Sequence, residues 1–188
     1  HGPDGFRLVE DQAGEAAKAF GRLKGFHGQM GMFVRALTYM MSHGSDGMRQ
    51  ASEDAVLNAN YIQSRLGDVM TAPFPGPCMH EALFDDRFLH GSGVSTLDMA
   101  KALIDEGFHP MTMYFPLVVH GAFLIEPTES EHKGTLDQFI QVMRSLVDRI
   151  KKGDTQFLHD APRLTPRRRL DETLAARKPV LRWTPSQA

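Results

Sequence analysis

Apolar positions follow a helical period in several stretches of the chain. In residues 29–42 they recur every three to four positions, and Gly44 stands where a residue with positive φ would end a helix. We expect a buried helix there. A second, long helix is expected to start at Ser45 or Asp46 and to end near Leu66, because small and apolar residues mark one face over its whole length. The strongest helical period covers residues 136–150.

Shorter patterns between these helices predict strands. Prolines alternate with other residues in 71–77, which favours an extended segment, and 78–84 then has the composition of a strand. A helix is expected in 96–106, with Ser95 and Asp98 spaced as a capping box. Two further strands, 112–115 and 122–126, are expected to form a hairpin-like pair through Pro116 and Gly121.

The order βαββα predicts an α+β fold, in which a small antiparallel or mixed sheet carries helices on one face. We expect three parts: an arm with helices in 1–70, the small α+β domain in 71–152, and an extended tail in 153–188. The arm is expected to be irregular up to residue 28. Prolines limit regular structure in the tail to a short helix in 169–177, and Trp183 is its expected anchor.

Composition excludes several classes of protein. The chain has 188 residues, 41% of them hydrophobic, and a formal net charge of −2, which is enough apolar material for a core and gives no global attraction to nucleic acid or anionic lipid. No apolar run is long enough to span a membrane. Cys78 is the single cysteine, so neither an intrachain disulfide nor a cysteine-rich zinc site is expected, and a reducing cytoplasm is the expected location. The sequence starts at His1 without methionine, which suggests a piece of a longer protein.

Carboxylates and a hydroxyl gather where the last predicted strand ends. Glu126, Thr128 and Glu129 follow it directly, and such positions often present functional groups on a rigid scaffold. Thr128 also has the spacing to Glu131 of a capping box for the next helix, and we favour that role for it. For Glu126, lining a site and simple solvation are equally good interpretations.

Two other groups stand out near the first helix. Arg35 projects from an apolar helix, so it needs a carboxylate partner, a ligand or a route to solvent, and a structural ion pair is the favoured interpretation. Gly28 precedes the helix and permits close backbone approach, so His27, Gly28 and Gln29 could receive an anion at the helix start. A tight turn in which His27 binds the backbone is the alternative.

A zinc site at His80 and Glu81 is not expected. The metalloprotease pattern needs a second histidine three residues after the glutamate, and Phe84 occupies that position. No metal is therefore predicted from the sequence.

Several segments together resemble a known family. They are Phe26-His27-Gly28, Ala55-Val-Leu-Asn-Ala-Asn60, Cys78-Met-His-Glu81, Gly107-Phe-His-Pro110, Phe123-Leu-Ile-Glu-Pro-Thr-Glu-Ser-Glu131 and the closing run from Thr165-Pro166 to Trp183. This set resembles the carboxyl-terminal part of glycine dehydrogenase (decarboxylating), the P-protein of the glycine cleavage system, and the Cys78-Met-His-Glu81 version is most similar to subunit 2 of the two-subunit prokaryotic form.

The resemblance implies a pyridoxal-phosphate enzyme of fold type I that decarboxylates glycine and passes the aminomethyl group to the lipoyl arm of the H-protein. The cofactor lysine of the family lies upstream of everything in this chain, so no catalytic residue is expected here and the chain alone is expected to be inactive. The implied partners are the upstream half of subunit 2, subunit 1 and lipoylated H-protein. His27, Gly28 and Gln29 would contact the cofactor phosphate; Arg35, Glu126, Thr128 and Glu129 would line the mouth of the active site.

Two alternatives remain open at this point. The first is an interaction module that keeps the small-domain fold without catalysis and docks a subunit or a lipoyl protein. The second is a different aminotransferase-like enzyme, since one fold serves many reactions. Apolar surface left without its large domain would favour self-association in either case.

Overall fold

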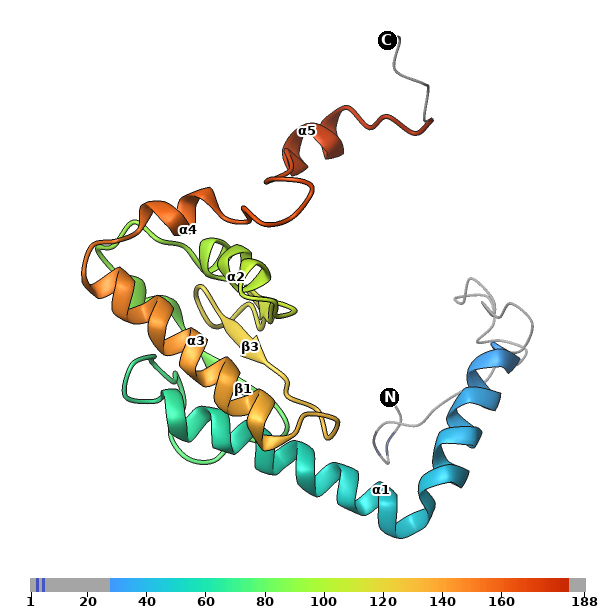
Figure 1. The fold of residues 1–188 in the computed structure, drawn as a ribbon. Helices are drawn as coiled ribbons and strands as arrows, with labels where there is room; N and C mark the ends of the chain where they lie inside the picture. Colours follow the sequence, from blue (N-terminus) through green and yellow to red (C-terminus); the bar gives the residue numbers. More distant parts are fainter. Residues whose placement is uncertain (1–2, 4, 6–27, 183–188) are drawn as a thin grey trace. The chain divides into compact units, whose positions relative to one another are not determined.

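The computed structural model describes Pro3, Gly5 and residues 28–182 (Figure 1). His27 and Trp183 thus lie outside the described residues, as does most of the arm that we expect to be irregular. The chain divides into two compact units, His1–Asp46 and Gly47–Ala188. The three-part division expected from the sequence stays a prediction. No helix in the described ranges combines the length and the apolar character needed to cross a membrane.

Helix α1, Met30–Leu66, belongs to both units and is interrupted at Gly44, whose φ of 65° and ψ of −177° are not helical. The helix stop predicted at Gly44 is thereby confirmed. The predicted burial of the first stretch is wrong: Met32, Phe33 and Leu37 are 55%, 56% and 54% exposed. A helical period shows which side of a helix is apolar, but it does not show what covers that side. These side chains remain about half exposed.

The second unit is built around a three-stranded sheet of β1 (Ala82–Phe84), β2 (Thr112–Met113) and β3 (Phe123–Ile125). Their order is β1-β3-β2, and both pairs are antiparallel. The α+β fold with a small antiparallel sheet is confirmed, as is the pairing of the last two strands.

Strand β1 is shorter than predicted because another element binds its expected start. The side chain of Asn60 in α1 donates to the Cys78 carbonyl over 2.7 Å and accepts from the Cys78 amide over 3.0 Å. The backbone groups of Cys78 are thus satisfied by a side chain instead of by a neighbouring strand.

The core lies on one face of this sheet. Phe84 and Phe123 are opposite each other in the register, fully buried, and packed in one cluster with the end of α1, with α2 (Thr96–Asp105) and with α3 (Lys133–Lys151). Figure 1 shows α3 running along the sheet. On the other face, Leu83 and Leu124 are half-buried and line a hollow formed mainly by loop residues. This arrangement puts the end of β3 beside the start of α3.

The two helix starts differ in how well the sequence predicts them. The Ser95 and Asp98 capping box of α2 is present with both of its hydrogen bonds. The capping box predicted for Thr128 and Glu131 is wrong, because α3 begins at Lys133 and its N-cap is His132, whose ring nitrogen accepts from the Thr135 amide over 3.2 Å. The chain is still extended at His132, four residues after Thr128, whereas an N-cap directly precedes the first helical residue.

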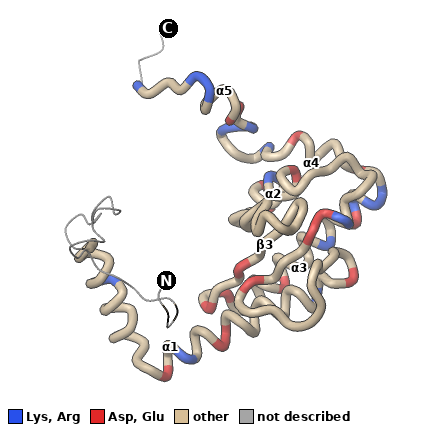
Figure 2. The backbone as a smooth tube through the Cα atoms, turned by 180° about the vertical axis from the view of Figure 1, so that it is seen from behind, with Lys and Arg blue, Asp and Glu red and all other residues tan. Residues whose placement is uncertain are grey.

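The remaining elements are short: η2 (Asp86–Leu89), α4 (Gln156–Asp160) and α5 (Glu172–Arg177). Arg169, between the last two helices, pairs with Asp98 of α2 over 2.7 Å and donates to the carbonyls of Ala161 and Leu158. The segment after α4 is therefore tied to the start of α2. Acidic positions mark the segment between β3 and α3, whereas basic positions mark the segment around α5 (Figure 2).

Candidate functional site

A hollow of about 400 Å³ lies where β3 ends and α3 begins. We call it the β3–α3 hollow. Its floor is apolar, with Ile62, Leu136 and Phe139 among its residues, and its volume lies in the range of small-molecule sites. Polar groups that line it are His109, Thr112, Glu126, Thr128, Glu131 and Thr135. An apolar floor with several polar groups suits a small ligand that has both an aliphatic and a polar part.

The turn that carries these polar groups is held by Asn58 of α1. The Asn58 side-chain amide donates to the Thr128 carbonyl over 3.0 Å and to the Glu131 carbonyl over 3.1 Å. Thr128 also shares a 2.7 Å hydrogen bond with the hydroxyl of Ser130. The role of Thr128 is thus within the turn, where its carbonyl and hydroxyl stabilise the conformation that presents Glu126.

Beside the hollow, three side chains form a charged network. Lys133 lies 2.6 Å from Asp137 and over the ring of Tyr61, and the Tyr61 hydroxyl donates to the same carboxylate. Hydrogen bonds from Lys133 and then from Tyr61 hold the pKa of Asp137 below its usual value, while the hydrogen bond to Asp137 raises the pKa of Lys133. Lys133 is therefore a firmly protonated ammonium and a poor nucleophile.

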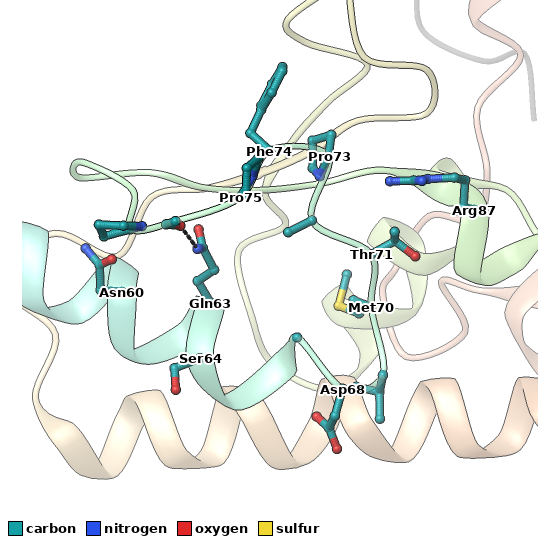
Figure 3. Close-up of a pocket in the computed structure, with 15 residues that line it drawn as sticks. Asn60, Gln63, Ser64, Asp68, Met70, Thr71, Pro73, Phe74, Pro75 and Arg87 are labelled. Carbon is teal, nitrogen blue, oxygen red and sulfur yellow. Dashed lines mark hydrogen bonds between the residues drawn. The ribbon is translucent and has the colours of Figure 1, made fainter.

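A larger hollow of about 1010 Å³ lies between residues 60–77 and Arg87 (Figure 3). Its charged groups already have protein partners. Arg87 lies 2.7 Å from Asp85, and Asp68 receives two hydrogen bonds from Arg144, the main reason that the pKa of Asp68 is lowered. Gln63 donates to the Gly76 carbonyl, the contact drawn in Figure 3. The Gln63 contact holds the proline-rich segment on α1, and the charged groups are already paired, so we assign this hollow a structural role.

The structure brings together only part of the predicted site. Glu126 and Thr128 line the β3–α3 hollow, and Glu129 is exposed just after them without lining it. Gly28, Gln29 and Arg35 belong to the first unit, and His27 lies outside the described residues. The roles predicted for these residues stay predictions.

Within the first unit, Gly28 and Gln29 form the start of α1. Gly28 has a φ of 122°, and a Cβ there would meet the ring of Phe33 at 2.6 Å, so glycine is required on two grounds. The Gln29 carbonyl accepts from the amides of Met32 and Phe33. Arg35 makes no ion pair with any described residue; its guanidinium lies 3.8 Å from the sulfur of Met32.

The partners of Asn58 and the contact of Tyr61 with Asp137 could not be predicted from the sequence, although Asn58 lies within the family-like segment 55–60. These partners lie 70 to 76 positions apart, and a period or a motif describes only neighbours. Asn58 does stand out in one respect, as a polar residue on a helix that packs against the core.

Replacing Asn58 by alanine is expected to loosen the turn at residues 128–131 and to lower the free energy of unfolding by about 1–2 kcal/mol, because two carbonyls lose their donor. Hydrogen exchange of the amides in 128–132 should speed up in this variant. Gln50→Ala is the matched control, since among the described residues the Gln50 side chain binds Asp54 on the same helix and no residue of the turn. Equal exchange rates in both variants would contradict the assignment.

Comparison with known proteins identifies the family. Residues 51–163, more than half of the chain, match the family model described as glycine dehydrogenase, C-terminal domain. A protein of Caulobacter vibrioides named probable glycine dehydrogenase (decarboxylating) subunit 2 is 65% identical over the whole chain. Proteins with the same name from Bacillus cereus and Kosmotoga olearia are 47% and 45% identical over 96% and 92% of the chain.

The chain spans only 36% of the length of each of these three relatives. It therefore corresponds to about a third of such a protein, and the matched region contains α2, the sheet, α3 and the β3–α3 hollow. By these sequence matches, the chain belongs to the glycine dehydrogenase C-terminal domain family.

Proposed function

We propose that this chain is the carboxyl-terminal portion of a pyridoxal-phosphate-dependent glycine dehydrogenase of the glycine cleavage system. The whole enzyme would decarboxylate glycine and pass the aminomethyl group to the lipoyl arm of the H-protein. The observation that carries this proposal is the 65% identity to a probable glycine dehydrogenase (decarboxylating) subunit 2 along the complete chain. A lone cysteine, Cys78, fits the reducing cytoplasm as its location.

The lysines of the described residues do not fit the covalent attachment of pyridoxal phosphate. That attachment needs an amine that can lose its proton at the cofactor. Lys133 and Lys152 are exposed and ion-paired at 2.6 Å, and no lysine lines the β3–α3 hollow. The amine would come from polypeptide outside this chain.

The β3–α3 hollow is the part of this chain that we propose for the mouth of the active site. Glu126 and Thr128 would meet the substrate or the lipoyl arm there, with Glu129 as a further contact. Arg35, in the first unit, is proposed separately as a residue that contacts the substrate. The apolar floor supports this role because a lipoyl arm is an aliphatic chain, and the rigid turn held by Asn58 keeps the rim in place. His27, Gly28 and Gln29 would receive the cofactor phosphate, which the start of a helix without acidic residues in its first turn can favour.

The exposed apolar side of α1 supports a role within a larger assembly. Met30, Met41, Phe33, Val34 and Leu37 are all more than half exposed, an unusual density for one helix side in water. We propose that this side packs on the upstream half of subunit 2 or on subunit 1.

Mixing this chain with the separately produced upstream half, subunit 1 and lipoylated H-protein tests the proposal. We expect exchange of labelled bicarbonate into the glycine carboxyl group in the full mixture, and none when this chain is omitted. Formation of a stable complex without any exchange would instead support a non-catalytic interaction module, and it would contradict the enzymatic role.

A further inference from the structure

The antiparallel register of the sheet places two carboxylates opposite each other. Ala82 pairs with Ile125, so the next positions outward are Glu81 and Glu126. Side chains alternate along strands, and these two therefore share the face of Leu83 and Leu124, away from the helical core. Like charges directly opposite in a sheet are destabilising.

His80 adds a nitrogen ligand to this carboxylate pair. One potential ligand atom from each of His80, Glu81 and Glu126 lies within 4.8 Å of the other two. Bonds of about 2.0–2.2 Å from an ion to imidazole nitrogen and carboxylate oxygen require these atoms to close by roughly 1 Å. His80 and Glu126 are exposed and Glu81 is half-buried, so side-chain rotation can supply that movement.

These three groups have no competing side-chain partner in the part of the chain that the structure describes. No ion pair neutralises either carboxylate, and no hydrogen bond there engages the imidazole. By contrast, most other acidic groups on this unit are paired, as Asp68 is with Arg144 and Asp137 with Lys133. The cluster thus combines two unneutralised charges with three converging ligand atoms.

We propose that His80, Glu81 and Glu126 bind a divalent transition-metal ion of borderline character, for which Zn²⁺ is the probe. Mixed imidazole and carboxylate ligands suit such ions, and a double positive charge offsets the repulsion that the register imposes. This proposal does not rest on the proposed function. It differs from the sequence-based expectation of no metal because the third ligand comes from another strand instead of from the next helical turn.

Three protein ligands leave at least one coordination position open, as in zinc sites that bind water or a ligand. Glu126 also lines the β3–α3 hollow, and Glu81 lines the hollow that includes Leu83; Leu124, on the same face as both glutamates, lines both hollows. A bound ion would therefore lie at the edge of both hollows, within reach of a small anionic or water ligand.

Isothermal titration of the 188-residue chain with Zn²⁺ tests this site. We expect one ion per chain, and a dissociation constant that rises roughly tenfold or more in each of the variants His80→Asn, Glu81→Gln and Glu126→Gln. Far-ultraviolet circular dichroism verifies that each variant is folded.

Two control variants separate the site from surface binding. Glu106→Gln removes one exposed negative charge, as Glu126→Gln does, and His90→Asn removes an exposed histidine that lies 3.8 Å from Asp86. Both should bind Zn²⁺ as the unmodified chain does. The proposal is overturned if no stoichiometric binding occurs, or if either control variant loses binding as much as the three site variants do.

Discussion

Replacing Phe123 by alanine is expected to lower the free energy of unfolding by about 3–5 kcal/mol. Phe123 is fully buried in β3, opposite Phe84, and its ring centre lies 5.4 Å from that of Phe88. Truncation removes the apolar contacts of a large side chain and leaves a cavity in the middle of the sheet. Since domains of this kind are stable by about 5–15 kcal/mol, the loss would be a large part of the total.

Urea denaturation followed by circular dichroism measures this effect. Phe115→Ala is the matched control, because Phe115 is 55% exposed in the loop between β2 and β3. We expect that variant to change the free energy of unfolding by no more than about 0.5 kcal/mol. Equal losses in the two variants would show that the sheet face assigned to the core is wrong.

Replacing Arg169 by alanine is expected to lower the free energy of unfolding by about 2 kcal/mol. Hydrogen bonds to charged groups contribute about 1.5–3 kcal/mol each, and the partial exposure of the Arg169 side chain reduces the total. The change removes the cation from buried Asp98 and the donor from the carbonyls of Ala161 and Leu158. Arg168→Ala is the control, since Arg168 makes only a 3.4 Å contact with the Pro162 carbonyl.

The cost of Arg169→Ala should depend on pH. Burial alone would raise the pKa of Asp98, but hydrogen bonds from Ser95 and the pairing with Arg169 outweigh it and hold this pKa below its usual value. A carboxylate with a lowered pKa stabilises the fold above the pKa of the unfolded chain, near 3.9, and loses that contribution as pH falls through the folded value.

Denaturation at several pH values measures this dependence. The difference between Arg169→Ala and the unmodified chain should be constant from about pH 7 to pH 5 and should shrink below about pH 4. His159, whose ring nitrogen lies 3.6 Å from Asp98, shares this carboxylate with Arg169, so both proteins are compared in a His159→Asn background. A difference that persists unchanged into strong acid would mean that the pairing with Asp98 is not what Arg169 contributes.

Local signals predicted the elements that local forces determine. The Ser95 and Asp98 capping box, the stop at Gly44 and the period of α3 need only residues within a turn or two, and the structure has all three. The hairpin-like pairing of β2 with β3 could also be predicted, because a short connection leaves two adjacent strands few other ways to pair.

The features that the sequence did not predict depend on distant partners. The strand expected to begin at Cys78 begins later, because the side chain of Asn60 binds the Cys78 backbone. Asn58 holds Thr128 in a turn instead of at a helix cap. Glu81 and Glu126 meet only because β1 and β3 pair in one particular register. In each case the sequence shows the residue type but not the distant residue that it contacts.

The burial predicted for the first stretch of α1 failed for another reason. Its apolar period is real, but the chain is about a third of the length of its relatives, and Phe33 and Leu37 remain 56% and 54% exposed. Family membership came from motifs spread over the whole chain, which the comparison with the Caulobacter protein confirms.

Reduction with borohydride followed by peptide mass spectrometry tests the central claim most directly. The reconstituted mixture of this chain, the upstream half and subunit 1 is loaded with pyridoxal phosphate and reduced, which fixes the cofactor on the lysine that carries it. The account predicts one labelled lysine in the upstream half and none in these 188 residues. A stoichiometric label on any lysine of this chain would contradict it.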